Sequence, residues 1–439
     1  LKGHVSLGSL RIRQDFLIAQ ALIGHYDQGE SNDAAMTAMA LDRIRQLSCH
    51  EVGHTLGLMH NYASSTQQRA SVMDYPHPLI RLKENGAADL SQAYTRGVGL
   101  WDKVAIAYGY QEFGRTEEMK TLSQFLNDVF SQGVLYLTDQ DARGASSAHP
   151  HAHLWDNGAH PVTELKRLLA LRHRILTDFS EKRIPQGSPM GTLEDVLVPA
   201  YLLHRYQIEA ASKVLGGLYY HHSVRGDSLP LPRIVPPEEQ WEAMDALMLT
   251  LQPKHLTLDE RLLSLMPPRP PGYGQTGEQL VSRTSPVFDP LAAAESVADM
   301  TVGLILNRQR AERLVQFHAR DASNPGLTGV MDRLIRQFWL SAHEAGMSGE
   351  LRRTVAGVVL NHLMRLASDT EASFQVRSRV WLRLQTLRGS LEKRLKKNTN
   401  PLIRAHMRYG HDSIARFLEH GEALMTVESV QPPRGEPIG

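Results

Sequence analysis

The stretch SCHEVGHTLGLMHNYAS, from Ser48 to Ser64, contains three histidines and one glutamate at spacings that could hold a metal ion and activate water. His50 and His54 are four residues apart, so on a helix their imidazoles project from the same face, one turn apart. Two nitrogens placed in this way can reach one ion at about 2.0–2.1 Å, the distance that zinc requires. Glu51 would then lie beside the open position of the ion, where a carboxylate can exchange protons with water and a leaving amine.

A glycine and a third histidine extend this pattern to HExxHxxGxxH. Gly57 is a natural end for the helix, because glycine tolerates the left-handed backbone conformation that ends many helices. The chain can then turn back and bring His60 to the ion as a third nitrogen ligand. Three histidines leave one position open for water, which is typical of catalytic zinc and not of a closed structural site. The sequence therefore predicts one catalytic Zn²⁺ on His50, His54 and His60, with Glu51 as the general base.

One long helix is expected to carry the first two histidines. The segment SNDAAMTAMALDRIRQLSCHEVGHTLG has apolar residues at helical spacing, with Ser31, Asn32 or Asp33 as its N-cap. Further helices are predicted in LWDKVAIAYGY (100–110), EEMKTLSQFLNDVF (117–130) and VTELKRLLALRHRILTDFS (162–180), and a strand in GVLYLTD (133–139). A long helical run over 193–220 contains Pro199 and should bend or break there.

The composition is that of a folded, water-soluble type of chain. Hydrophobic residues at 42% and charged residues at 22% fit a globular protein, and 439 residues suggest two or three domains. The formal net charge of +1 gives no reason to expect a nucleic-acid or membrane-surface partner, and we interpret the basic run EKRLKK (392–397) as the solvated face of a helix. A single cysteine excludes an intramolecular disulfide, and no apolar run approaches the ~20 residues that span a bilayer.

The segment HEVGHTLGLMH resembles the zinc-binding consensus of the metzincin metallopeptidases. In that family a tight turn with a methionine lies beneath the zinc site, and here SVMDYPHP supplies Met73 after His60. The resemblance implies that Met73 forms the base of the metal pocket and is not a ligand. In metzincins with a Met-x-Tyr turn, the tyrosine, here Tyr75, either ligates the zinc or swings away to hydrogen-bond the developing oxyanion. The alternative is that Tyr75 only packs beside the turn.

More of the chain is similar to the large bacterial zinc-dependent metalloproteases whose catalytic region is called the Met-zincin domain. The similarity covers most of residues 1–320, in KGHVSLGSLRIRQDFLIAQAL, RASVMDYPHP, WDKVAIAYGY, LWDNG and YLLHRYQIEAASKVLGG. It implies a periplasmic, cell-envelope or extracellular peptidase that acts on proteins or peptides. Metzincins place a twisted sheet before the zinc helix, and the 49 residues before His50 are too few for it. We therefore expect this chain to be the C-terminal part of a longer protein, and its activity alone is in question.

These observations predict a mainly α-helical (α+β) fold with a metzincin-like zinc helix and Met-turn, a small residual sheet and large helical domains. The expected parts are a catalytic region (1–130), a helical middle region (131–265), a linker rich in proline and glycine (266–290), a C-terminal helical domain (291–425) and a flexible tail (426–439). No feature of the sequence indicates the oligomeric state.

The predicted function is that of a zinc-dependent endopeptidase in which Glu51 activates water and Tyr75 shares the oxyanion charge with the zinc. Two alternatives stay open: a helical binding or scaffold protein with a non-catalytic zinc site, and a zinc hydrolase of non-peptide bonds. Asp102 could hydrogen-bond a ligand histidine. His149, His151, His153 and His160 could form a second metal cluster, but histidines in a polar loop are more often surface residues, and we favour that interpretation. The tripeptide RGD (225–227) could indicate integrin recognition, but we favour a chance occurrence of so short a motif.

Overall fold

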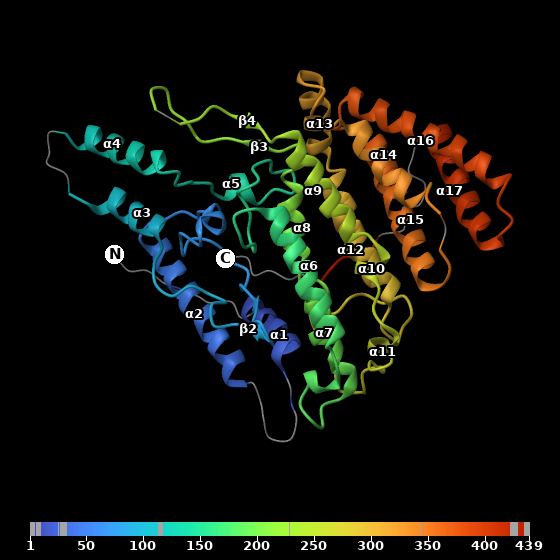
Figure 1. Cartoon of the computed structure of the whole chain (residues 1–439), viewed down its shortest axis with the longest axis horizontal. Helices are drawn as coiled ribbons and strands as arrows, with labels where there is room; N and C mark the ends of the chain where they lie inside the picture. Colours follow the sequence, from blue (N-terminus) through green and yellow to red (C-terminus); the bar gives the residue numbers. More distant parts are fainter. Residues whose placement is uncertain are drawn as a thin grey trace.

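The computed structural model describes residues 5, 10–24, 26, 33–112, 117–227, 229–342, 344–421 and 429–433. Most of these residues are helical, and the strands are short (Figure 1). This confirms the mainly α-helical fold with a small sheet. In the part of the chain that the structure describes, no helix combines the length and the apolar character needed to cross a membrane.

The predicted long helix that carries the first two histidines is present. It is α2 (Asp33–Thr55), and it packs against α1 (Leu10–Ile23). Two of the expected N-cap residues, Ser31 and Asn32, lie outside the described residues. Gly57 has a φ of +82°, a conformation that side chains with a Cβ rarely adopt, so the helix ends where the glycine predicts.

The chain after α2 forms a compact, loop-rich region with a few short elements. These are η1 (Ser64–Gln67), β1 (Arg81–Leu82), β2 (Ala88–Asp89), α3 (Leu100–Tyr110) and α4 (Glu118–Ser131). The two strands are antiparallel, with Arg81 opposite Asp89. Helices α3 and α4 confirm the two helices that the apolar spacing predicts for this region.

The strand predicted over 133–139 is wrong. Gly133 is part of a turn, residues 134–138 belong to no helix or sheet, and α5 (Asp139–Ala142) begins at the last predicted strand residue. Leu137 accepts a hydrogen bond from the backbone of Tyr62 (2.7 Å), while its own N–H donates to the side chain of Asn61 (3.3 Å). An amide side chain therefore replaces one half of a strand ladder, and the pairing places α5 beneath the segment that follows the zinc-binding motif.

The middle of the chain is helical and carries one hairpin. Its elements are α6 (Pro161–Thr177), η2 (Glu181–Arg183), η3 (Met190–Thr192), α7 (Leu193–Tyr201), α8 (Arg205–Ser212), β3 (Leu218–Tyr219), β4 (Arg233–Ile234), α9 (Pro237–Thr250), α10 (Pro253–Leu256) and α11 (Glu260–Leu263). The long run is broken as predicted, but at 202–204 and not at Pro199, which lies inside α7. A proline removes one helical hydrogen bond, and here the helix continues for two residues beyond it.

Among the described residues, six helices follow the segment 266–290, which has no helix or strand before the start of the first of them. They are α12 (Pro290–Ile305), α13 (Arg308–Arg320), α14 (Leu327–Phe338), α15 (Gly346–Ser368), α16 (Phe374–Leu395) and α17 (Pro401–His420). Figure 1 places α2 and α3 toward one end of the molecule and α16 and α17 at the opposite end.

A single large hydrophobic core joins these parts. It extends from Leu17 in α1 through α6 to α9 and the six last helices to Val430. Two small clusters of buried apolar residues lie beside it, one around Tyr75 and Trp155 and one around Trp101. The division into five parts stays a prediction, and of the predicted tail the structure describes residues 429–433 only.

Candidate metal centre

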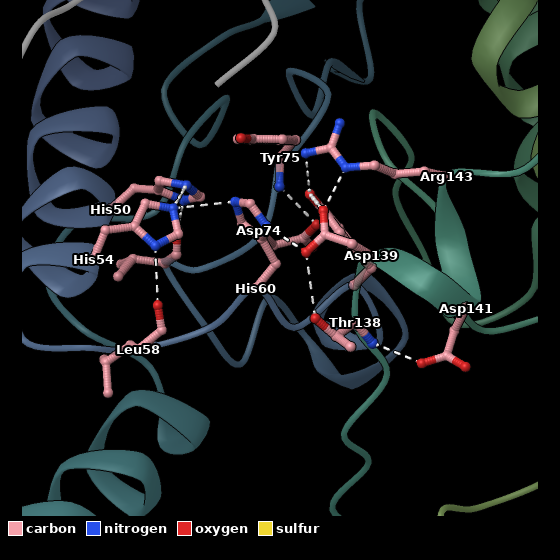
Figure 2. A network of polar contacts seen from close by, with 12 residues as sticks. His50, His54, Leu58, His60, Asp74, Tyr75, Thr138, Asp139, Asp141 and Arg143 are labelled. Carbon is pink, nitrogen blue, oxygen red and sulfur yellow. Dashed lines mark hydrogen bonds and ion pairs between the residues drawn. The ribbon is translucent and has the colours of Figure 1, made fainter.

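Three imidazoles converge where α2 ends. The Nε2 atom of His54 lies 3.1 Å from Nε2 of His50 and 3.1 Å from Nε2 of His60 (Figure 2). His50 is buried, and the other two rings are partly exposed. Over the described ranges, this is the one group of three or more histidine, cysteine or carboxylate side chains whose ligand atoms lie close enough to hold a metal ion.

The outer nitrogen of each ring contacts an oxygen, and this fixes which nitrogen carries the proton. Nδ1 of His50 donates to the carbonyl of Val72 (2.7 Å), and Nδ1 of His54 donates to the carbonyl of Leu58 (2.9 Å). In His60, Nδ1 donates to a carboxylate oxygen of Asp139 (2.8 Å). A carbonyl or carboxylate oxygen only accepts, so each neutral ring presents a lone pair on Nε2.

These lone pairs face one another, and a cation bound between them would remove their mutual repulsion. Burial lowers the pKa of His50 to about 3, and burial also lowers the pKa of His60, so neither ring gains a second proton near neutral pH. Ligands of a tetrahedral zinc ion, at about 2.0–2.1 Å from it, are roughly 3.3 Å apart. The 3.1 Å separations match that spacing, so the residues fit a bound metal ion.

A methionine turn lies directly beneath the helix. Met73 is fully buried, and its sulfur occupies the space in front of Gly53, where a Cβ would lie 2.3 Å from Sδ. The carbonyl of Met73 accepts a hydrogen bond from the backbone of Asn61 (2.9 Å), in the segment after the third histidine. The sequence predicted Met73 as the base of the pocket, but it gave no reason to single out Gly53, which makes the contact possible.

Tyr75 lies on the same turn with its ring beside two of the histidines. Its ring centroid is 5.0 Å from those of His50 and His60, and its other face stacks on Trp155 at 5.0 Å with an interplanar angle of 9°. Burial raises the pKa of the Tyr75 hydroxyl, and the nearby charge of Arg143 opposes this rise. The structure therefore places Tyr75 at the centre, and Trp155 fixes the plane of its ring.

An acidic residue that the sequence reasoning missed orients the third histidine. Asp139, at the start of α5, accepts from His60 with one oxygen and from Nε of Arg143 with the other. Nη2 of Arg143 also donates to the hydroxyl of Tyr62 (3.0 Å). Burial disfavours the charge on Asp139, but the hydrogen bonds from Arg143 and His60 outweigh it and lower its pKa to about 2. Asp139 is therefore ionised and holds the Nδ1–H of His60 in place (Figure 2).

Asp102, which the sequence suggested as a possible hydrogen-bond partner of a ligand histidine, instead binds the turn that contacts His50. Its carboxylate accepts from Ser71 Oγ (2.6 Å), from the backbone of Val72 (2.9 Å) and from the backbone of Gly99 (2.6 Å). Val72 is the residue whose carbonyl accepts from His50. Asp102 therefore fixes the turn that orients a histidine, and it contacts no histidine of the centre itself.

Glu51 is partly exposed on α2, next to His50. Within the described part of the chain its carboxylate has no hydrogen-bond or ion-pair partner, and its charge contributes to the raised pKa of Tyr75. Within the described residues, the structure thus places an unengaged carboxylate on α2, one residue after His50. Such a group is able to accept and release a proton.

The other candidates have structural explanations. His149 and His153 are buried, contrary to the expectation of surface histidines, and the four histidines of that loop form no group of converging ligand atoms within the described residues. In the RGD tripeptide, the carboxylate of Asp227 accepts from the backbone of Val224 (2.6 Å) and of Leu229 (3.1 Å). Its own turn thus engages both oxygens, which supports the chance reading of this motif.

Comparison with known proteins agrees with this geometry. A protein-family model described as Met-zincin matches residues 32–346, which is more than half of the chain and includes the whole metal centre. The chain has no significant match among curated proteins or among solved structures. On the strength of the family match and of the converging histidines above the methionine turn, this chain belongs to the Met-zincin family.

Proposed function

We propose that the protein is a zinc-dependent endopeptidase that acts on protein or peptide substrates. The observation that carries the proposal is the convergence of the Nε2 atoms of His50, His54 and His60 at the end of the helix that carries Glu51, whose carboxylate is unengaged in the described part of the chain. His50, His54 and His60 would hold the zinc, which supplies Lewis acidity that lowers the pKa of a water molecule and polarises a carbonyl.

Glu51 has the role of general base and then general acid. Its carboxylate takes the proton of the attacking water and afterwards delivers it to the nitrogen of the leaving amine. A carboxylate already bound to an arginine or a backbone N–H would have to break that contact first. The lack of such a partner within the described residues favours Glu51 for this task.

Tyr75 has the role of hydrogen-bond donor to the oxygen that becomes negative as water adds to the carbonyl. Burial raises the pKa of its hydroxyl, so the group keeps its proton at neutral pH and remains able to donate. The stack on Trp155 limits the orientations of the ring. A donor held in place before the reaction loses less free energy to reorganisation than a mobile one.

The decisive experiment compares Glu51→Gln with the wild type in two measurements: zinc content and cleavage of a proteome-derived peptide library. We expect the variant to keep one zinc per chain and to lose cleavage by about 10²–10⁴-fold, the usual contribution of a general base. Glu118→Gln is the matched control, because Glu118 is an exposed glutamate of α4 without an ion pair among the described residues.

Each alternative has its own outcome. Full activity of Glu51→Gln would remove Glu51 from the mechanism. A wild-type protein that binds zinc but cleaves no peptide in the library would contradict the peptidase proposal. It would favour a scaffold role or hydrolysis of another bond, and the latter would show as Glu51-dependent turnover of ester or amide test substrates.

A further inference from the structure

The helices α16 and α17 carry a positive net charge that is not apparent from the net charge of the whole chain. Residues 374–420, which comprise α16, α17 and their connection, contain eleven lysines and arginines against three acidic residues. With neutral histidines this is a net charge of +8, whereas the net charge of all 439 residues is +1. The remainder of the chain is therefore acidic on balance, and the positive charge is concentrated at one end of the molecule (Figure 1).

This charge is hardly neutralised by the rest of the fold. Among the described residues, Arg383 is the one cation of the eleven that forms an ion pair with another element, at 3.2 Å from Asp332. Two further pairs, Lys396 with Glu392 and Arg408 with Asp412, lie within residues 374–420 and are already counted in their net charge. The other eight cations have no ion pair in the described part of the chain, and four of these are exposed and also make no side-chain hydrogen bond there: Arg388, Lys393, Lys397 and Arg416.

Large apolar side chains are exposed between these cations. In α16, Phe374 (81% exposed), Trp381 (43%) and Arg388 follow one another at intervals of seven residues and so share one face. In α17, Leu402 (54%), Tyr409 (65%) and Arg416 repeat the same intervals. The core-facing side of α16 is formed by other residues: Val376, Val380, Leu384, Leu387, Leu391 and Leu395. The exposed apolar residues are therefore not needed to hold the helix on the protein.

We propose that residues 374–420, which comprise α16, α17 and their connection and are named here the basic helix pair, bind the surface of a bilayer that contains anionic phospholipids. Lysines and arginines are attracted to the negative surface, while aromatic and leucine side chains enter the interface between headgroups and acyl chains. A nucleic acid would also attract the cations, but an exposed leucine such as Leu402 gains little from a phosphate backbone. The combination of +8 charges with exposed aliphatic and aromatic residues favours the lipid surface.

This inference goes beyond the proposed function and does not depend on it. The basic helix pair lies outside residues 32–346, the range of the family match, and at the opposite end of the molecule from α2 (Figure 1). Binding through this pair would leave the metal centre turned away from the bilayer. The protein would then be a peripheral membrane protein whose reaction centre faces the aqueous phase.

The test is co-sedimentation of the whole chain with vesicles of phosphatidylcholine and phosphatidylserine, compared with vesicles of phosphatidylcholine alone. We expect binding to the anionic vesicles that weakens as salt is added. The variant R388Q/K393Q/K397Q/R416Q removes the four exposed cations without an ion pair. Each lysine or arginine near an anionic surface raises the affinity about fivefold, so this variant should bind the anionic vesicles at least about 100-fold more weakly than the wild type. Phe374→Ser should weaken binding without changing the salt dependence.

The matched control removes four exposed cations elsewhere, in R81Q/K83Q/K103Q/K254Q, and should bind like the wild type. Circular dichroism of each variant verifies that the helices remain folded. Equal binding of both quadruple variants would overturn the proposal, because a general positive charge would then suffice. Tighter binding to a single-stranded or duplex oligonucleotide than to anionic vesicles at the same salt would also overturn it, as would a lack of vesicle binding by the folded wild type.

Discussion

Glu51 and Asp139 are both acidic residues of the metal centre, and their surroundings suit them to opposite tasks. Glu51 is unengaged within the described residues, which suits a group that must accept and release a proton. Asp139 accepts from both His60 and Arg143, which suits a group that must stay ionised and still. The division of labour follows from the hydrogen-bond partners and not from the residue type.

Removal of the Asp139 carboxylate should weaken metal binding. In Asp139→Ala the Nδ1–H of His60 loses its acceptor, and zinc affinity should fall about 10–100-fold, as for other partners of ligand histidines. Asp139→Asn keeps an acceptor oxygen and should retain part of the affinity. Competition with a chromogenic chelator measures both variants, with Asp128→Asn on the exposed face of α4 as control. An unchanged affinity in Asp139→Ala would show that Asp139 does not orient His60.

At this scale the sequence predicts what lies close together along the chain. The three histidines, Glu51 and Gly57 fall within eleven residues, so helical geometry is enough to relate them. Asp139 is 79 residues beyond His60, and nothing in its neighbours distinguishes it from other aspartates. The sequence does not predict the role of Trp155 either, because that role depends on stacking against Tyr75, which only the folded chain brings into contact with it.

Helix α2 and the methionine turn meet at Gly53, where no space is left for a Cβ. In Gly53→Ala the new Cβ would meet the sulfur of Met73, which is fully buried and has little room to move. Overpacking of this kind costs about 1–3 kcal/mol, so we expect a lower free energy of unfolding in urea and weaker zinc binding.

The chain offers a matched control for this substitution. Gly109 in α3 has no atom within 4 Å of an added Cβ, so Gly109→Ala should be neutral or slightly stabilising through helix propensity. The double variant Gly53→Ala/Met73→Ala should recover the part of the loss that comes from the clash. A Gly53→Ala protein as stable as the Gly109→Ala protein would contradict the tight contact.

Elements with a strong apolar period were predicted correctly, and elements defined by a partner were not. Helices α2, α3, α4 and α6 agree with their predicted ranges to within a few residues, because their periodicity is local. The segment 133–138 has the composition of a strand but pairs with a side-chain amide of Asn61 as well as with backbone. Composition reports the extended conformation and not the identity of the partner.

The stability of the whole molecule should depend on a buried carboxyl beneath the centre. Burial raises the pKa of Asp156 to about 7, although a hydrogen bond from Ser65 (3.0 Å) opposes this rise. The folded protein then keeps a proton that the unfolded chain has lost between about pH 4 and pH 7. The contribution of this group is therefore fully present at acidic pH, and the free energy of unfolding should fall as the pH rises through this window.

Asp156→Asn isolates this effect, since asparagine keeps an acceptor for Ser65 but cannot ionise. Urea denaturation in the presence of a chelator, at pH values from about 5 to 8, should give a shallower loss of stability for the variant than for the wild type. Parallel curves for the two proteins would exclude Asp156 as the source of the pH dependence.

Bulk properties of the sequence describe this molecule poorly. A net charge of +1 averages an acidic body with a basic helix pair, so it conceals the surface that we propose for anionic lipid. The basic run EKRLKK is correctly expected on a solvated helix face, but its meaning depends on the neighbouring α17. A linker was predicted for 266–290, yet Leu280 of this segment is part of the common hydrophobic core.

The core that joins Leu17 to Val430 constrains how the protein is made. A ribosome releases residues in order, and Gln14 of α1 donates to the carboxylate of Glu278, which is translated 264 codons later. The guanidinium of Arg205 likewise donates to the carbonyl of Pro433 (3.0 Å), 228 residues further along the chain. The apolar side chains of early segments therefore stay exposed to solvent until their partners have been synthesised. We expect nascent chains of this protein to depend on chaperones until translation has passed Pro433.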